Sequence, residues 1–163
     1  MSLVEARGLR KEFTTGSGLV SRLFSGGVVH AVDGVDLDIE RGQTMGLVGE
    51  SGCGKSTLGN LLLRVNDPTD GTVRFNGTDI TGLSGSELRP YRSEMQMVFQ
   101  NPQGSLNPKH TVGKILRKAI TFHDVAKEGE ADALAKQYLE DVGLRPDHAD
   151  RYPHEFSGGQ QQR

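Results

Sequence analysis

Alternating apolar and polar residues mark the first regular element of the chain. Val35, Leu37 and Ile39 alternate with acidic residues at 36, 38 and 40, which predicts a half-exposed strand with a period of two. The run 44–48 is short and mostly apolar, which is typical of a buried parallel strand. The pattern therefore predicts two kinds of strand, one half-exposed and one buried.

Helical spacing appears in three later stretches. Apolar residues at 58, 61, 62 and 65 recur at the spacing of one helix face. Thr111 can cap a helix that carries its apolar residues on one face. A further helix over about 131–142 is expected to close at Gly143.

Turn and capping signals lie between these stretches. Residues 73–75 followed by Asn76 and Gly77 predict a hairpin. Ser84 and Glu87 form a possible capping box. Pro90 is expected to end or restart the helix that this box begins.

Composition limits the class of protein. The 163 residues suit one domain, and the formal net charge of −2 gives no support for nucleic-acid binding, which usually shows a basic face. Cys53 is the single cysteine, which excludes an internal disulfide and fits a reducing compartment. The sequence has neither the run of about 18 apolar residues that a membrane span needs nor a signal-peptide pattern. We expect a cytosolic protein whose membrane attachment depends on partners.

Residues 49–57 fit the phosphate-binding loop pattern of Gly, four residues, and then Gly-Lys-Ser. Backbone N–H groups can hold a triphosphate if the chain wraps closely around it, and close wrapping needs glycine because a Cβ would clash. Lys55 would reach the β- and γ-phosphates of ATP, the Ser56 hydroxyl would ligate Mg²⁺, and Thr57 could donate to the α-phosphate. The predicted nucleotide-binding residues here are Gly49, Ser51, Gly52, Cys53, Gly54, Lys55, Ser56 and Thr57.

Plainer interpretations of this loop exist. A glycine-rich turn capped by an ordinary surface lysine would give the same residues, but the predicted order of strand, loop and helix favours phosphate binding. Cys53 could be a reactive thiol at a helix N-terminus, or simply a small residue that fits the loop.

Residues 156–160, Phe-Ser-Gly-Gly-Gln, form a second motif. Ser157 and Gln160 by themselves would be a capping box at a helix start. Gly158 and Gly159 in the first turn are costly for a helix, but they expose N–H groups to an incoming anion. We therefore predict that residues 157–160 contact a phosphate.

With both motifs, the chain resembles the ATP-binding subunits of ABC transporters over nearly its whole length. In that family the Ser-Gly-Gly-Gln signature of one subunit closes over the γ-phosphate held by the phosphate loop of a second. ATP then lies between two subunits in a head-to-tail dimer, which can be a homodimer or a heterodimer. Phe156 stands where the family's signature usually begins with Leu.

The resemblance implies a fold of the α/β class, an incomplete P-loop NTPase of the ABC nucleotide-binding type. Its parts would be an N-terminal antiparallel β portion, a partial parallel core sheet and an α-helical subdomain. Residues 1–163 would be the N-terminal part of one such domain. The β-rich and phosphate-loop portion would take about 1–100, and the helical subdomain with the signature about 101–163.

A third match lies between the two motifs. The strand-like run 95–99 ends at Gln100, which matches the glutamine of the family's Q-loop and would approach Mg²⁺ and the attacking water. Residues 100–108 and 31–35 look like the oligopeptide, dipeptide and nickel importer branch, although Asn101 stands where that branch usually has Asp.

This branch implies an ATPase that couples ATP binding and hydrolysis to import of peptides or a similar small solute. Its partners would be a second ATPase subunit, transmembrane permease subunits contacting a groove around 101–110, and indirectly an extracytoplasmic solute-binding protein. The subunit would be cytoplasmic and peripheral on the inner face of the cell membrane. In the family an aromatic residue stacks on adenine; Phe24 is the candidate here, with His30 and Phe13 as alternatives.

In the family, a strand ending in Asp-Glu follows the signature, and a switch histidine comes later. The Asp supports Mg²⁺ and the Glu activates water, and residues 1–163 hold no match to them. We therefore expect a fragment of a longer subunit, or a truncated product, that binds nucleotide at best and hydrolyses ATP barely. Two alternatives are a non-catalytic regulatory nucleotide-binding module and a non-transport ABC ATPase. A single cysteine and the lack of a basic linker give the second little support.

Overall fold

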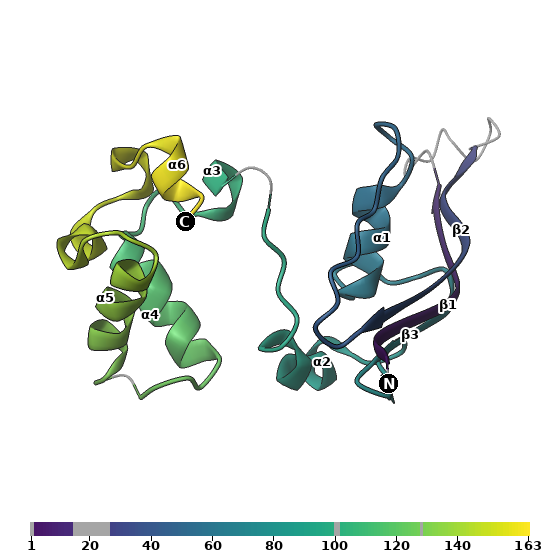
Figure 1. Ribbon diagram of the computed structural model, residues 1–163, viewed down its shortest axis with the longest axis horizontal. Coiled ribbons are helices and arrows are strands. Elements are labelled where there is room, and N and C mark those ends of the chain that lie inside the picture. The colour runs from purple at the N-terminus through teal and green to yellow at the C-terminus, as the bar shows by residue number, and fades with distance from the viewer. Residues whose placement is uncertain (1, 15–26, 100–101, 128) are drawn as a thin grey trace, which may run out of the picture. The chain divides into compact units, whose positions relative to one another are not determined.

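The computed structural model describes residues 2–14, 27–99, 102–127 and 129–163 (Figure 1). The chain divides into two compact units, Met1–Gln96 and Met97–Arg163, each with its own apolar core. In the part of the chain that the structure describes, the first unit combines an antiparallel sheet with two helices, and the second is helical. Within the described ranges, no helix is long and apolar enough to cross a membrane.

The sheet of the first unit has four strands in the order β2-β1-β3-β4. The strands are β1 (Ser2–Thr14), β2 (Val28–Glu40), β3 (Asp70–Phe75) and β4 (Thr78–Asp79). β1 is central, because Ala6 pairs with Leu37 of β2 on one side and with Val73 of β3 on the other. The alternation predicted for β2 is confirmed, since residues 35, 37 and 39 are partly buried and residues 36, 38 and 40 are exposed.

The predicted hairpin joins β3 to β4. Asn76 and Gly77 have φ values of 48° and 80°, the pair of positive angles that a type I′ turn requires. Phe75 and Thr78 are paired across this turn. The Asn-Gly pair therefore accounts for the tight connection.

The parallel strands expected in the core are not formed in the described residues. Residues 44–48 and 95–99 lie outside every strand, and Val48 and Val98 are 94% and 92% exposed. A parallel strand needs a ladder partner and cover on both faces, whereas every ladder of the described residues is antiparallel. The α/β class stands, but the expected partial parallel sheet at these two runs is corrected.

The described residues of the first unit also form two helices. α1 (Lys55–Leu62) buries Leu58 and Leu61 and partly buries Leu62, as the helical spacing predicted, but Val65 lies beyond the helix and is 54% exposed. α2 (Gly85–Arg92) buries Leu88 in the same cluster. The remaining buried members of this cluster come mainly from the strands: Ala6, Leu9, Val32, Val73, Phe75, Ile80 and Met95.

The capping box of α2 is confirmed, but the expected effect of its proline is wrong. The Ser84 backbone N–H donates to Glu87 Oε2 at 2.8 Å. α2 continues through Pro90 to Arg92. A proline removes its own N–H donor and crowds the carbonyl four residues earlier, but here only two residues of the helix follow it.

The backbone just after α1 is unusual. Arg64 has a φ of 51°, in the left-handed region where helices usually place glycine. The Val65 N–H donates to the Asn60 carbonyl at 2.8 Å, and the Arg64 N–H donates to the Leu61 carbonyl at 2.9 Å. These two bonds form a Schellman closure with arginine in the glycine position.

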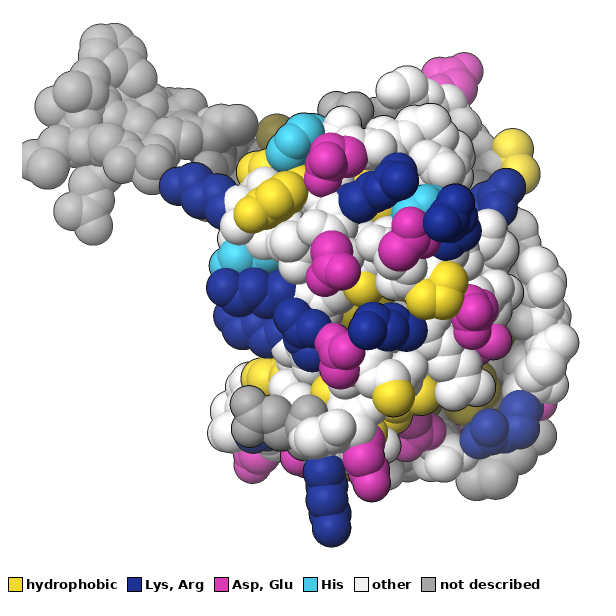
Figure 2. Space-filling view, turned by 90° about the vertical axis from the view of Figure 1, so that its left-hand side faces the viewer, with side chains coloured by type: hydrophobic (Ala, Val, Ile, Leu, Met, Phe, Trp, Pro, Cys, Tyr) yellow, Lys and Arg dark blue, Asp and Glu magenta, His cyan; other side chains and the backbone are white. Residues whose placement is uncertain are grey.

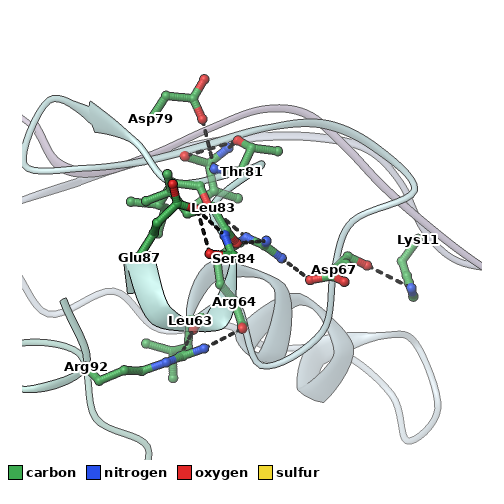
Figure 3. A network of polar contacts seen from close by, with 12 residues as sticks. Lys11, Leu63, Arg64, Asp67, Asp79, Thr81, Leu83, Ser84, Glu87 and Arg92 are labelled. Atoms are coloured by element: carbon green, nitrogen blue, oxygen red, sulfur yellow. Dashed lines mark hydrogen bonds and ion pairs between the residues drawn. The ribbon is translucent and has the colours of Figure 1, made fainter. Parts of the chain in front are cut away.

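The buried side chain of Arg64 compensates for this backbone. Its guanidinium donates to Ile80 O at 2.9 Å, to Asp67 Oδ1 at 2.5 Å and to Leu83 O at 3.3 Å (Figure 3). The hydrogen bond from Arg64 holds the pKa of the Asp67 carboxyl below its usual value. A left-handed non-glycine residue costs about 1–2 kcal/mol, and contacts of this kind offset it.

The second unit consists of short helices. They are α3 (Pro102–Ser105), α4 (Val112–Phe122), α5 (Ala131–Asp141), the 3₁₀ turns η1 (Pro146–Asp150) and η2 (Pro153–Glu155), and α6 (Gly158–Gln161). Ile120 of α4 packs with Ala131 and Ala135 of α5. Gly113 lets α4 approach η1 closely, because a Cβ there would lie 2.8 Å from the Ala149 carbonyl oxygen.

Both predicted ends of these helices are confirmed. Thr111 Oγ1 accepts a hydrogen bond from the Lys114 N–H at 3.4 Å and caps α4. Gly143 has a φ of 73°, and the Leu144 N–H donates to the Leu139 carbonyl at 2.8 Å after α5. α4 therefore begins at a side-chain cap, and α5 ends at a glycine, as the sequence predicted.

Positive and negative side chains are interspersed on the face shown in Figure 2. Asp132 of α5 forms ion pairs with Arg117 of α4 and, at 3.1 Å, with Lys136 of its own helix. The hydrogen bonds from Lys136 and then Arg117 hold the pKa of Asp132 below its usual value.

We expect Thr111→Ala to destabilise the start of α4 by about 1 kcal/mol, because the N-cap oxygen is lost. Thr111→Ser keeps that oxygen and serves as the matched control. Hydrogen exchange of the amides at 112–116 measures the effect. Equal protection in the two variants would contradict the capping role.

We also expect acid to weaken the pairing of α4 with α5. Because the folded-state pKa of Asp132 is depressed, its contribution is present above the unfolded pKa of about 3.9 and is lost as pH falls through the lower folded value. Asp132→Asn should flatten this part of the pH dependence of unfolding in urea. Asp141→Asn, an exposed change in the same helix, should leave it as it is.

Candidate functional site

A glycine-rich loop leads directly into α1 (Figure 1). Gly52 and Gly54 have φ values of 83° and 93°. Gly54 also approaches β2, since a Cβ built on it would lie 2.2 Å from the carbonyl oxygen of Ala31. Glycine is required at 54 for its backbone conformation and for this contact with the sheet.

The amino group of Lys55 turns back into this loop. Its Nζ donates to Gly49 O at 2.8 Å and to Glu50 O at 2.5 Å, and lies 3.6 Å from Cys53 Sγ. Three acceptors match the three hydrogens of an ammonium group. A positive charge is therefore held among the residues of the loop.

Within the described ranges, the backbone donors in the first turn of α1 have no side-chain cap. Gly54 is the N-cap residue, no side chain of the described residues caps this end, and the first turn contains no acidic residue. The first N–H groups of a helix lack partners within the helix and carry partial positive charge. Together with Lys55, this donor set fits an anion such as a phosphate group.

Ser56 and Thr57 lie in the same turn. Ser56 is exposed and Thr57 is partly buried. A hydroxyl oxygen beside phosphates suits Mg²⁺, which prefers oxygen ligands and keeps several waters. Among the described residues, no group of three His, Cys, Asp or Glu side chains is placed to hold a metal. Ser56 and Gln100 are the two residues predicted to approach Mg²⁺, and of these Ser56 is the one that the structure describes.

Cys53 is an exposed free thiol. A Cβ added to Gly49 would lie 2.7 Å from its Sγ. The thiol therefore occupies the space beside Gly49, and small residues at both positions suit the packing of the loop. Ser51, in the same loop, is exposed.

The second motif forms a capping box. The Ser157 N–H donates to Gln160 Oε1 at 3.0 Å, and the Gln160 N–H donates to Ser157 Oγ at 3.3 Å. Gly158 and Gly159 are exposed, and a Cβ on either would meet nothing within 4 Å. Packing therefore does not require glycine at these two positions. The fold of this unit does not explain why two residues that destabilise a helix lie in its first turn.

Phe156 anchors this motif to the second unit. Its ring is buried and lies edge-on to the ring of His148, with 5.4 Å between the centroids. Gln161 Nε2 donates to the Pro153 carbonyl at 2.6 Å, which ties α6 to η2. Phenylalanine thus serves as a core residue where the family's signature usually has leucine.

An apolar cavity, which the sequence did not predict, adjoins Phe156. Its volume is about 350 Å³. Side chains of α4, α5 and α6 line it, among them Leu116, Leu139 and Gln161. No single periodic pattern reveals such a cavity, because its walls come from segments far apart in the chain.

Several predicted residues have no described environment. Gln100, Asn101 and Phe24 lie outside the described residues. Of the alternatives for Phe24, the Phe13 ring lies 5.2 Å from Lys11 Nζ, and His30 Nδ1 lies 3.3 Å from Glu12 Oε1. The described site residues therefore fall into two groups, one at the start of α1 and one at the start of α6.

A family model described as ABC transporter matches residues 32–163. The chain belongs to the ABC transporter family. It is 45% identical over 163 residues to the oligopeptide transport ATP-binding protein AppF of Bacillus subtilis, covering 99% of this chain and 49% of that protein. It is 46% identical over 164 residues to the glutathione import ATP-binding protein GsiA of Salmonella typhimurium, covering 99% of this chain and 26% of that protein.

Solved ABC cassettes have the same fold. The dimeric post-hydrolysis structure of the ATP-binding cassette MJ0796, bound to ADP and Pi, has a TM-score of 0.79 at 26% identity. That match covers 97% of this chain and 65% of the cassette. The match to this cassette confirms the α/β fold class. The chain spans about half the length of the oligopeptide transport protein AppF.

We expect Gly54→Ala to destabilise the first unit much more than Gly52→Ala. Both changes place alanine at a positive φ, at a cost of about 1–2 kcal/mol, but only at 54 does the Cβ meet the Ala31 carbonyl. Urea unfolding of the two variants measures the difference. Equal losses would contradict the close approach of the loop to β2.

Proposed function

We propose that the chain is part of the ATP-binding subunit of an ABC importer of peptides or a similar small solute. The observation that carries this proposal is the loop at the start of α1, where Lys55 Nζ is held among loop carbonyls beside a helix end that no described side chain caps. The oligopeptide and glutathione importers among its relatives support the class of solute.

Each residue of the loop has a separate role in this proposal. The backbone N–H groups of residues 49–54 surround the phosphates, and the glycines allow that backbone to come close. Lys55 moves from the carbonyls of Gly49 and Glu50 to the β- and γ-phosphates, and Thr57 donates to the α-phosphate. Ser56 holds Mg²⁺, which neutralises charge on the phosphates when bound.

The residues 157–160 would act on a second nucleotide. Ser157 and the N–H groups of Gly158 and Gly159 would contact the γ-phosphate bound by a partner subunit, in a head-to-tail dimer. Gln160 supports this turn through its bond to the Ser157 N–H. The cassette MJ0796 was solved as a dimer, which favours this arrangement.

Coupling to transport would need further subunits. Gln100 would approach Mg²⁺ and the attacking water, and the groove around 101–110 would contact transmembrane permease subunits. The protein would then be cytoplasmic and peripheral on the inner face of the membrane, with a solute-binding protein acting outside. We expect residues 1–163 by themselves to hydrolyse ATP barely, because they contain no match to the family's base and metal aspartate.

Thermal unfolding with and without Mg-ATP tests the proposed binding. At one hundred times the dissociation constant, ATP should add about 2.7 kcal/mol and raise the midpoint by roughly 5–10 °C. Lys55→Ala should abolish this rise, because the phosphates lose their cation. Lys118→Ala, a lysine of α4 in the other unit, is the control and should keep it. No rise in the unsubstituted chain would contradict nucleotide binding by these residues.

A further inference from the structure

α1 is a short helix that begins at the phosphate loop and ends beside α2. Its eight residues span about 12 Å, so a displacement of its C-terminal end also tilts the turn that carries Lys55 and Ser56. Errors of about 1 Å in the placement of a binding or catalytic group can cost two orders of magnitude in rate. The contacts at the far end of α1 therefore matter for the nucleotide site.

Two arginines hold that far end (Figure 3). Arg64 is fixed by its left-handed backbone and by its three side-chain hydrogen bonds. Arg92, from the last turn of α2, donates through Nη1 to the Leu63 carbonyl and through Nη2 to the Arg64 carbonyl, the latter at 2.7 Å. Its guanidinium thus binds two carbonyls at the end of α1.

The chemistry of this contact suits a guanidinium. Leu63 is the C-cap of α1, so its carbonyl is one of the last of the helix, which have no partner within it and carry partial negative charge, and a cation there is stabilising. Two parallel N–H groups from one planar fork fix a direction as well as a distance. A lysine ammonium in the same place would be a point charge without that fork.

Arg92 also joins α1 to the segment that follows α2. The Arg92 carbonyl accepts a hydrogen bond from Gln96 Nε2 at 2.6 Å. The N–H groups of Glu94 and Met95 both donate to the Tyr91 carbonyl at 3.0 Å. The residue that binds the end of α1 is therefore itself held in a compact turn.

We propose, on the basis of the proposed function, that Arg92 is a positioning residue for the phosphate loop. It fixes the C-terminal end of α1 and, through the helix, the direction in which Lys55 and Ser56 face a bound nucleotide. It does not touch the nucleotide. Its loss should therefore weaken nucleotide binding even in molecules that remain folded.

The experiment compares Arg92→Ala, Arg92→Lys and the control Arg41→Ala in the full chain. Arg41 also lies in the first unit, where its guanidinium makes an exposed hydrogen bond to Asn76 at 3.2 Å. Calorimetric titration with Mg-ATP is done well below the unfolding midpoint of each variant. We expect about a tenfold rise in the dissociation constant for Arg92→Ala, a smaller rise for Arg92→Lys, and a change under about twofold for Arg41→Ala.

Hydrogen exchange provides a second readout that needs no ligand. If Arg92 positions α1, the amides at 58–61, which donate within the helix beginning with Leu58 N–H to the Gly54 carbonyl at 2.8 Å, should exchange faster in the Arg92 variants than in Arg41→Ala. A purely structural role would lower the unfolding midpoint but leave both the affinity and this exchange unchanged, and that result would overturn the proposal.

The outcomes separate this inference from the proposed function. If the unsubstituted chain does not bind Mg-ATP, the proposed function fails, and the exchange at 58–61 still decides whether Arg92 positions α1. If Arg92→Ala does not fold, Arg92→Lys carries both measurements. Unchanged affinity and exchange in the lysine variant would then contradict the role of the guanidinium fork.

Discussion

The close approach of Gly54 to the Ala31 carbonyl is the constraint on which the first unit depends. A single Cβ at 54 would lie 2.2 Å from that oxygen, so the loop can reach this position only with glycine. The contact fixes the start of α1 against β2, and β2 is fixed in turn by its ladder with β1. The antiparallel sheet thus positions the loop where a parallel strand was expected to do so.

The sequence predicted those features that depend on a few neighbouring residues. The Asn76-Gly77 turn, the Ser84 and Ser157 capping boxes, and the Thr111 cap were all found where expected. Each is a local matter, because its hydrogen bonds join residues no more than about four apart. The alternation in β2 was also correct, since one face of a half-exposed strand shows in its own residues.

Features that depend on distant segments could not be predicted in this way. The apolar runs 44–48 and 95–99 have the composition of buried strands, but a strand exists only if another segment pairs with it. Arg64 occupies a glycine position because three carbonyl and carboxylate oxygens from residues 67–83 accept its hydrogen bonds. The family, in contrast, followed from the two motifs and their order, and the match over 32–163 confirms it.

The capping box at Ser157 has a consequence for the choice between a simple helix start and an anion site. A hydroxyl group has two lone pairs and one hydrogen. The cap uses the oxygen as an acceptor for the Gln160 N–H, which leaves the hydrogen of the hydroxyl uncommitted by the cap. One side chain can therefore stabilise α6 and at the same time present a donor outward, so the two interpretations of this motif do not compete.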